Sequence, residues 1–194
     1  MSSTNALGQP IGFPLSGWTP PPVPARTAIG GRYCRLEPMH ERFALELHAA
    51  AAHDRDGRTW TYLPYGPFAS EDECRRWLIR DCLGDDPAFF VIVDAATEAM
   101  YLMMRRAFEA GFRRYEWKCD ALNAPSRAAA ERLGFTYEGI FRQATVVKGR
   151  NRDTAWYAAI DSEWPRLRAA FEAWLVPDNF DASGRQRRRL ESFR

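Results

Sequence analysis

The sequence predicts one soluble, intracellular α/β domain, and three observations support this. The chain has 194 residues, 46% of them hydrophobic and 27% charged, which suits a globular domain with a sizeable core. Segments with the pattern of strands alternate with segments that have the apolar spacing of amphipathic helices. The four cysteines are scattered and form no Cys-x-x-Cys pair, which is typical of thiols in a reducing cytoplasm.

An extended arm is predicted before the domain. It contains Pro20-Pro21-Pro22 and Pro24, and proline fixes φ and removes a backbone donor. Apolar side chains in the arm indicate that it lies on the domain surface; they are Ile11, Phe13, Leu15 and Trp18. The chain therefore divides into an arm over residues 1–29, a domain over residues 30–176 and a polar, basic tail over residues 177–194.

The first half of the domain begins with a strand and a helix. Arg32–Glu37 alternates as a strand, and Glu41–Ala52 is a helix rich in alanine and leucine. Residues 58–68 form an aromatic loop that two prolines and a glycine punctuate.

A second helix, a strand and a third helix follow. Ser70 and Glu73 form a capping box at the start of the second helix. The continuous apolar run Phe89–Val93 predicts a strand buried on both faces. Apolar residues at helical spacing then predict a helix over Ala95–Ala110, which Gly111 ends.

The second half of the domain is expected to close with a hairpin and a helix. In order, we expect a strand at Arg114–Cys119, a helix at Asn123–Leu133 closed by Gly134, two strands at Phe135–Val147 and Thr154–Ile160 around a turn over residues 148–153, and a helix capped by Ser162 that runs to Leu175.

One group of residues in this half has the pattern of a ligand site. A strand ends at Cys119, and Asn123-x-x-Ser126 then opens a helix. Asn and Ser in the first turn of a helix can simply satisfy its orphan backbone donors. Alternatively, their side chains face a ligand that lies between two strands. Spacing alone favours the capping role.

The longer string from Asn123 to Arg142 favours the ligand. N-x-x-S-x-x-x-x-E-R-L-G-F-x-x-E-G-x-x-R resembles the end of the acetyl-CoA fold in the GNAT superfamily of N-acetyltransferases. More narrowly, it is similar to the branch that contains the ribosomal-protein N-terminal acetyltransferases. Upstream, residues 95–99 resemble the end of that family's phosphate-binding loop and the start of its central helix. The resemblance covers roughly residues 30–175.

The resemblance implies a GNAT-like acyl-CoA N-acyltransferase fold, with a mixed sheet flanked by helices, and acetyl-CoA as acyl donor. Backbone N–H groups of Ala96 and Thr97 would meet the pyrophosphate, since a helix N-terminus favours anions. Asn123 would hold the pantetheine arm. Ser126 would bind near the thioester sulfur and protonate the leaving thiolate. Arg127 would reach a CoA phosphate, the alternative being an ordinary exposed helix arginine.

The chain departs from this family after Asp94. There the family places two more strands and a glycine-rich loop, which would occupy roughly 25–40 residues. Here Asp94 is followed at once by Ala95 and its helix. We infer an internal deletion that removes central strands of the sheet. The alternative to an active N-acetyltransferase is then a catalytically impaired relative without a complete CoA loop, and the uncovered sheet predicts self-association.

The acceptor of the acetyl group is expected to be a primary amine on a small molecule or peptide. In the resembling fold the aromatic loop borders the acceptor, so Trp60, Tyr62 and Tyr65 are candidates for substrate binding. The alternative is that these aromatic residues only pack the loop against the domain.

Other functions have little support in the sequence. The net charge is +2, so nucleic-acid binding is not expected, and the basic run at Arg185 and Arg187–Arg189 predicts a solvated end of the chain. The three histidines have no ligand spacing, so we expect no metal site. No apolar run approaches the roughly 20 residues that span a membrane.

Overall fold

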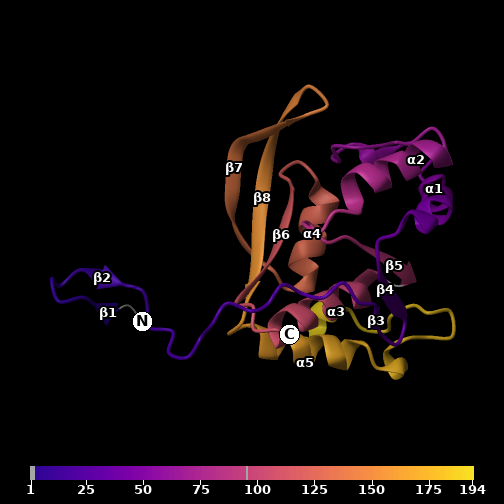
Figure 1. Ribbon diagram of the computed structural model, residues 1–194. Coiled ribbons are helices and arrows are strands. Elements are labelled where there is room, and N and C mark those ends of the chain that lie inside the picture. Colours follow the sequence, from indigo (N-terminus) through magenta and orange to yellow (C-terminus); the bar gives the residue numbers. More distant parts are fainter. Residues whose placement is uncertain (1–2, 95) are drawn as a thin grey trace.

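The computed structural model describes residues 3–94 and 96–194 and has an α/β architecture (Figure 1). Its strands are β1 (Ser3–Thr4), β2 (Pro10–Ile11), β3 (Ile29–Gly30), β4 (Cys34–Pro38), β5 (Phe90–Asp94), β6 (Arg114–Asp120), β7 (Thr136–Val147) and β8 (Arg150–Ile160). Its α-helices are α1 (Ala44–Ala51), α2 (Glu71–Trp77), α3 (Ala96–Glu109), α4 (Ala124–Leu133) and α5 (Trp164–Trp174). Short helical turns lie at Glu41–Phe43, Arg58–Trp60, Leu78–Cys82, Pro177–Asn179 and Leu190–Phe193.

The strands of the domain form two separate sheets, with the orders β3-β4-β5 and β6-β8-β7. Every pairing in the described part of the chain is antiparallel; Leu36 of β4 lies opposite Ile92 of β5, and Trp117 of β6 opposite Tyr157 of β8. Helix α3 follows β5 directly and contacts strands of both sheets. As a result, β5 and β6 each end a sheet and have one unpaired edge.

This arrangement corrects the expectation that the run at residues 89–93 is buried on both faces. Ile92 of β5 is 42% exposed. Val91, which points to the opposite face of β5, is buried, so only one face of this strand is covered by another layer.

The main core lies between the C-terminal sheet and helices α3, α4 and α5. Tyr157 and Phe171 are the largest of its fully buried side chains. The apolar stripe predicted for α5 is confirmed, since its five members are buried; they are Trp164, Leu167, Phe171, Trp174 and Leu175. A smaller cluster around Leu78 and Cys82 packs beneath α1 and α2.

The structure confirms one predicted helix cap and corrects another, and it also corrects the predicted length of a turn. The Ser70 cap is confirmed, because its Oγ accepts a hydrogen bond from Glu73 N at 3.2 Å. Ser162 does not cap α5; Glu163 takes that position and makes no side-chain bond to the helix. The turn of the last hairpin is also shorter than expected, because β8 already begins at Arg150.

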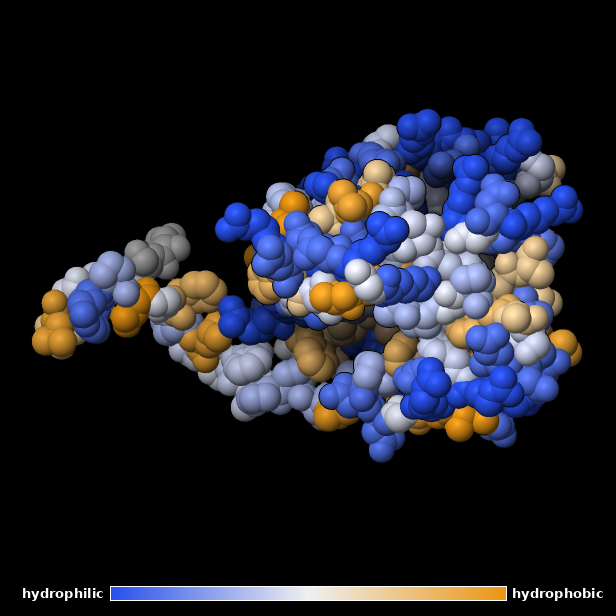
Figure 2. Space-filling view, turned by 90° about the horizontal axis from the view of Figure 1, so that it is seen from above, coloured by the Kyte–Doolittle hydropathy of each residue, from blue (hydrophilic) through white to orange (hydrophobic). Residues whose placement is uncertain are grey.

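The arm contacts the domain over part of its length. Trp18 Nε1 donates to Gly111 O at 3.4 Å, and Arg106 donates to the carbonyls of Ala25 and Thr27. The β1–β2 hairpin, by contrast, projects away from the body (Figures 1 and 2). Its Leu7 is exposed.

The C-terminal segment is packed, which corrects the expectation of a solvated end. Leu190 is 2% exposed and belongs to the main core. Asn179 is buried and binds the carbonyls of Trp174 and Arg188, and Arg194 donates to Glu131 O at 3.1 Å. Burial of Leu190 anchors a segment whose arginines remain at the surface. In the part of the chain described, no helix has the length and apolarity to cross a membrane.

Candidate functional site

Three of the predicted cofactor residues, Asn123, Ser126 and Arg127, lie where β6 ends and α4 begins, whereas Ala96 and Thr97 lie at the start of α3. Asn123 precedes α4, and its Oδ1 accepts a hydrogen bond from Ser126 N at 3.1 Å. The capping role is therefore present. It uses only the carbonyl oxygen of the Asn123 amide, so the amide NH₂ is not part of the cap.

The Ser126 side chain is fixed against the strand beneath it. Trp117 Nε1 of β6 donates to Ser126 Oγ at 3.1 Å, and the Trp117 ring packs on Phe135. The indole occupies one acceptor position of the hydroxyl. Because a hydroxyl also carries a donor, the Ser126 proton is available to another group.

The start of α3 lies beside the far end of α4. Thr97 Oγ1 accepts from Arg132 Nη1 at 3.4 Å. Ala95 and the side chain of Ala96 lie outside the described residues. Arg132 is six residues from Ser126, about 9 Å along the helix, so only an elongated ligand would meet both helix ends.

Arg132 has no role among the residues predicted from the sequence. Its position inside the Glu131–Phe135 string was the available signal, but an arginine in the last turn of a helix also suits the helix dipole. In the structure its guanidinium adds a positive charge at the N-terminus of α3, where the resemblance places a pyrophosphate.

Arg127 is neither exposed nor free, which corrects the alternative of an ordinary exposed helix arginine. Its Nε donates to the Tyr157 hydroxyl at 3.0 Å, and Nη1 donates to Ala121 O at 3.3 Å. The guanidinium also lies over the ring of Tyr137. Contact with a phosphate would require Arg127 to leave these partners.

Two of the three predicted substrate-binding residues belong to an aromatic cluster. Trp60 packs edge-on against Tyr65 and Phe68. The rings of Tyr65 and Phe68 each also pack against Trp77 of α2 in a tilted arrangement. Burial raises the pKa of the Tyr65 hydroxyl. Tyr62 is half-buried in the same loop but is not part of the cluster.

The tip of the β7–β8 hairpin reaches this aromatic loop. Lys148 Nζ donates to Trp60 O at 2.9 Å and to Gly66 O at 3.0 Å. From the sequence, Lys148 lies in a polar turn and has no predicted role, because nothing in the local sequence indicates a partner more than 80 residues away.

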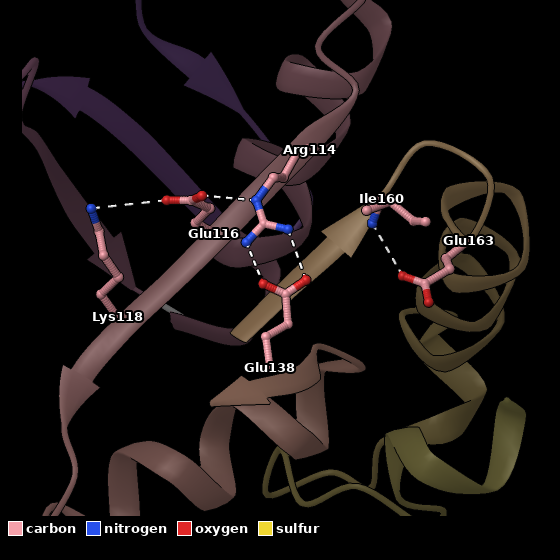
Figure 3. Close-up of polar contacts among 6 residues, drawn as sticks. All are labelled: Arg114, Glu116, Lys118, Glu138, Ile160 and Glu163. Carbon is pink, nitrogen blue, oxygen red and sulfur yellow. Dashed lines mark hydrogen bonds and ion pairs between the residues drawn. The ribbon is translucent and has the colours of Figure 1, made fainter. Parts of the chain in front are cut away.

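A row of charged side chains crosses the outer face of the C-terminal sheet (Figure 3). Arg114 of β6 donates to both carboxylate oxygens of Glu138 on β7, at 2.8 and 2.5 Å, and to Glu116 at 2.8 Å. Lys118 lies 3.9 Å from Glu116. The Arg114 guanidinium holds the pKa of Glu138 below its usual value.

A cavity of about 880 Å³ separates the two sheets. Its floor is the C-terminal half of α3, with Met103 and Ala107, and its walls include Phe90 of β5 and Tyr115 of β6. The arm at Val23 borders it as well. This cavity lies at the opposite end of α3 from Thr97 and is therefore separate from the predicted cofactor residues.

The fold and the β6–α4 site define an α/β protein of the acetyltransferase class, and comparisons identify the family. A GCN5-related N-acetyltransferase from Brucella melitensis is 42% identical, with a TM-score of 0.88, over 92% of this chain and 99% of that one. A probable GNAT-family acetyltransferase from Chromobacterium violaceum is 35% identical, with a TM-score of 0.74, over 81% and 98%. The chain belongs to the GCN5-related N-acetyltransferase family.

More distant structures share the fold. One is the Salmonella typhimurium acetyltransferase that modifies the N-terminal serine of ribosomal protein L7/L12, at 20% identity and a TM-score of 0.50, over 69% of this chain and 98% of that one. Acetyl-CoA is the acyl donor of this family. No protein-family model matches the chain, and no curated protein matches it either.

Proposed function

We propose that this chain binds acetyl-CoA along α4 and transfers the acetyl group to a primary amine. The observation that carries the proposal is the β6–α4 junction, where Asn123 and the Trp117-held Ser126 form the first turn of the helix. The pantetheine arm binds at Asn123, and the pyrophosphate binds near Thr97 and Arg132.

The reaction is a direct attack of the neutral amine on the thioester carbonyl carbon. A C–N bond forms, the tetrahedral intermediate collapses, and the C–S bond breaks. Ser126 Oγ gives its proton to the departing thiolate, which leaves as the CoA thiol, and the proton that the amine loses returns to Ser126 through solvent. The Trp117 indole supports this role, because its N–H takes a lone pair of Ser126 and leaves the hydroxyl proton for the sulfur.

The interrupted sheet favours a second candidate function, which is CoA binding without turnover. In the resembling fold, two strands that splay apart admit the pantetheine arm, and here β5 and β6 face a cavity instead of neighbouring strands. We propose that the two strands and the phosphate loop are deleted between Asp94 and Ala96. The free edges also lead us to propose self-association of the chain.

The first test is calorimetric titration of acetyl-CoA into the purified protein. Micromolar binding is expected, and Asn123→Asp should weaken it by about 10-fold, because the loss of an amide donor costs one hydrogen bond to the ligand. Asn123→Asp is the informative variant because a carboxylate oxygen still caps α4. No binding to folded protein would overturn the proposal.

The second test separates catalysis from binding with a panel of amines. Serine-initiated peptides, glucosamine and a small alkylamine serve as acceptors, and release of the CoA thiol is measured. Ser126→Ala should lower kcat by about 100-fold with little change in acetyl-CoA affinity, as expected for loss of a general acid. Trp117→Phe removes the indole donor and keeps the hydroxyl, so it should lower kcat less than Ser126→Ala does. An unchanged kcat in Ser126→Ala would show that Ser126 is not the general acid.

Binding without turnover of any amine would support the second candidate function.

We also propose that the protein works in a reducing compartment such as the cytoplasm. All four cysteines are buried, and burial raises the pKa of Cys74 and that of Cys82, the latter to about 11.

A further inference from the structure

The turn between β7 and β8 has a backbone conformation that lysine disfavours. It consists of Lys148 and Gly149, with φ values of +49° and +74°. Two-residue hairpin turns of this type favour Asn-Gly, because asparagine tolerates positive φ better than residues with long side chains. The turn geometry therefore gives no reason for a lysine at residue 148.

The Lys148 side chain supplies a reason. Its ammonium group donates to two backbone carbonyls of the aromatic loop, Trp60 O at 2.9 Å and Gly66 O at 3.0 Å. Hydrogen bonds from a charged donor are stronger than neutral ones. Within residues 3–94 and 96–194, no other hydrogen bond is seen between this loop and the hairpin.

The two carbonyls lie on either side of Tyr62 and Tyr65 in the aromatic loop. The Trp60 ring lies so close to Gly66 that a Cβ there would be 2.3 Å from Trp60 Cε3. Trp60 in turn packs on Tyr65 and Phe68. Because these contacts make the loop one packed unit, fixing its two carbonyls fixes the positions of the rings.

We propose that Lys148 is a positioning residue that holds the aromatic loop against the hairpin tip and so fixes the wall facing the amine acceptor. This inference rests on the proposed acetyl transfer. Lys148 itself does not touch the reacting atoms; it acts through Trp60 and Gly66.

Three variants test this role. Lys148→Asn removes the ammonium and suits the turn, Lys148→Arg keeps a donor for both carbonyls, and Lys118→Asn removes a lysine that contacts Glu116 and the Trp156 ring instead of the loop. The first readout is the rate at which an arginine-specific protease cuts after Arg58, at the start of the loop. Lys148→Asn should be cut about 10-fold faster than the wild type, with an unchanged or higher melting temperature.

The second readout is the split between kinetic constants with the best amine of the panel. Lys148→Asn should raise KM for the amine by about 10-fold and leave KM for acetyl-CoA unchanged, because loss of the charged hydrogen bonds loosens only the acceptor wall. Lys148→Arg should restore both readouts, and Lys118→Asn should match the wild type.

Equal cleavage rates for Lys148→Asn and the wild type would overturn the proposal, as would an unchanged KM for the amine. Failure of the proposed function is distinguishable from this result. If the wild type does not bind acetyl-CoA, acetyl transfer is wrong, whereas the protease comparison still decides whether Lys148 holds the loop.

Discussion

Single residues determine the shape of the aromatic loop. Gly66 has a φ of +62° and no room for a Cβ, because the ring of Trp60 fills that space. Gly57 immediately precedes the loop with a φ of +68°, and nothing lies within 4 Å of the place where its Cβ would be. The two glycines share a backbone conformation and differ in their surroundings.

This difference allows a matched prediction. Gly57→Ala should cost about 1–2 kcal/mol of stability, which is the penalty of a left-handed backbone with a Cβ. Gly66→Ala should cost about 1–3 kcal/mol more, because the methyl group overlaps a bulky ring. Chemical denaturation of the two variants measures the difference. Equal losses would mean that Trp60 moves aside without cost.

At the scale of elements, β6 joins the core to the cavity. One face of the strand carries Tyr115, Trp117 and Cys119, which pack on the main core, and the other carries the charged row. The Tyr115 ring packs near Phe135 and also lines the cavity. Burial raises the pKa of Tyr115 to about 12, from an ordinary value of 10.0.

The raised pKa predicts an alkaline loss of stability. Between pH 10 and about 12 the folded protein keeps the Tyr115 proton while the unfolded chain loses it, so the folded state binds more protons and stability falls as pH rises. The contribution of Tyr115 to the free energy of unfolding is fully present below pH 10. Above that pH, the free energy of unfolding falls because of this group by up to about 1.4 kcal/mol per pH unit. Denaturant titrations from pH 9 to 12 measure it. Tyr115→Phe should flatten the slope, and an unchanged slope would contradict the assignment.

At the scale of the whole molecule, the division of the domain into two separate sheets is the dominant feature. The strands β5 and β6 each have a free edge and border the cavity of about 880 Å³, and Ile92 of β5 is exposed. Apolar surface around such a cavity stabilises the fold less than a packed sheet would.

Insertion of the missing segment tests the proposed deletion. Insertion of the family's two-stranded hairpin and loop between Asp94 and Ala96 should raise the melting temperature by about 5 °C or more, because it covers the floor of the cavity. It should also reduce the self-association that we propose, as measured by sedimentation, since it pairs both free edges. A glycine-serine insert of equal length is the control. Equal melting temperatures for the two inserts would argue against missing strands.

The sequence by itself determined most of the elements and the family. Composition, capping residues and hydrophobic periodicity placed each described α-helix to within a few residues, and the Ser70 and Asn123 caps follow from local chemistry. The string from Asn123 to Arg142 identified the family, because its members lie on adjoining elements with fixed spacing. Local patterns suffice for such features, since the interacting groups are only a few residues apart in the chain.

Only the tertiary structure decided which distant groups meet. The bonds from Lys148 to the aromatic loop, from Arg132 to Thr97 and from Trp117 to Ser126 depend on how elements pack. The same holds for the exposure of Ile92 and the burial of Leu190. The apolar run around Ile92 wrongly predicted a strand buried on both faces, and the basic run before Leu190 wrongly predicted a solvated segment. A side chain's partners across the fold are set by the packing of whole helices and sheets, and no single segment encodes that packing.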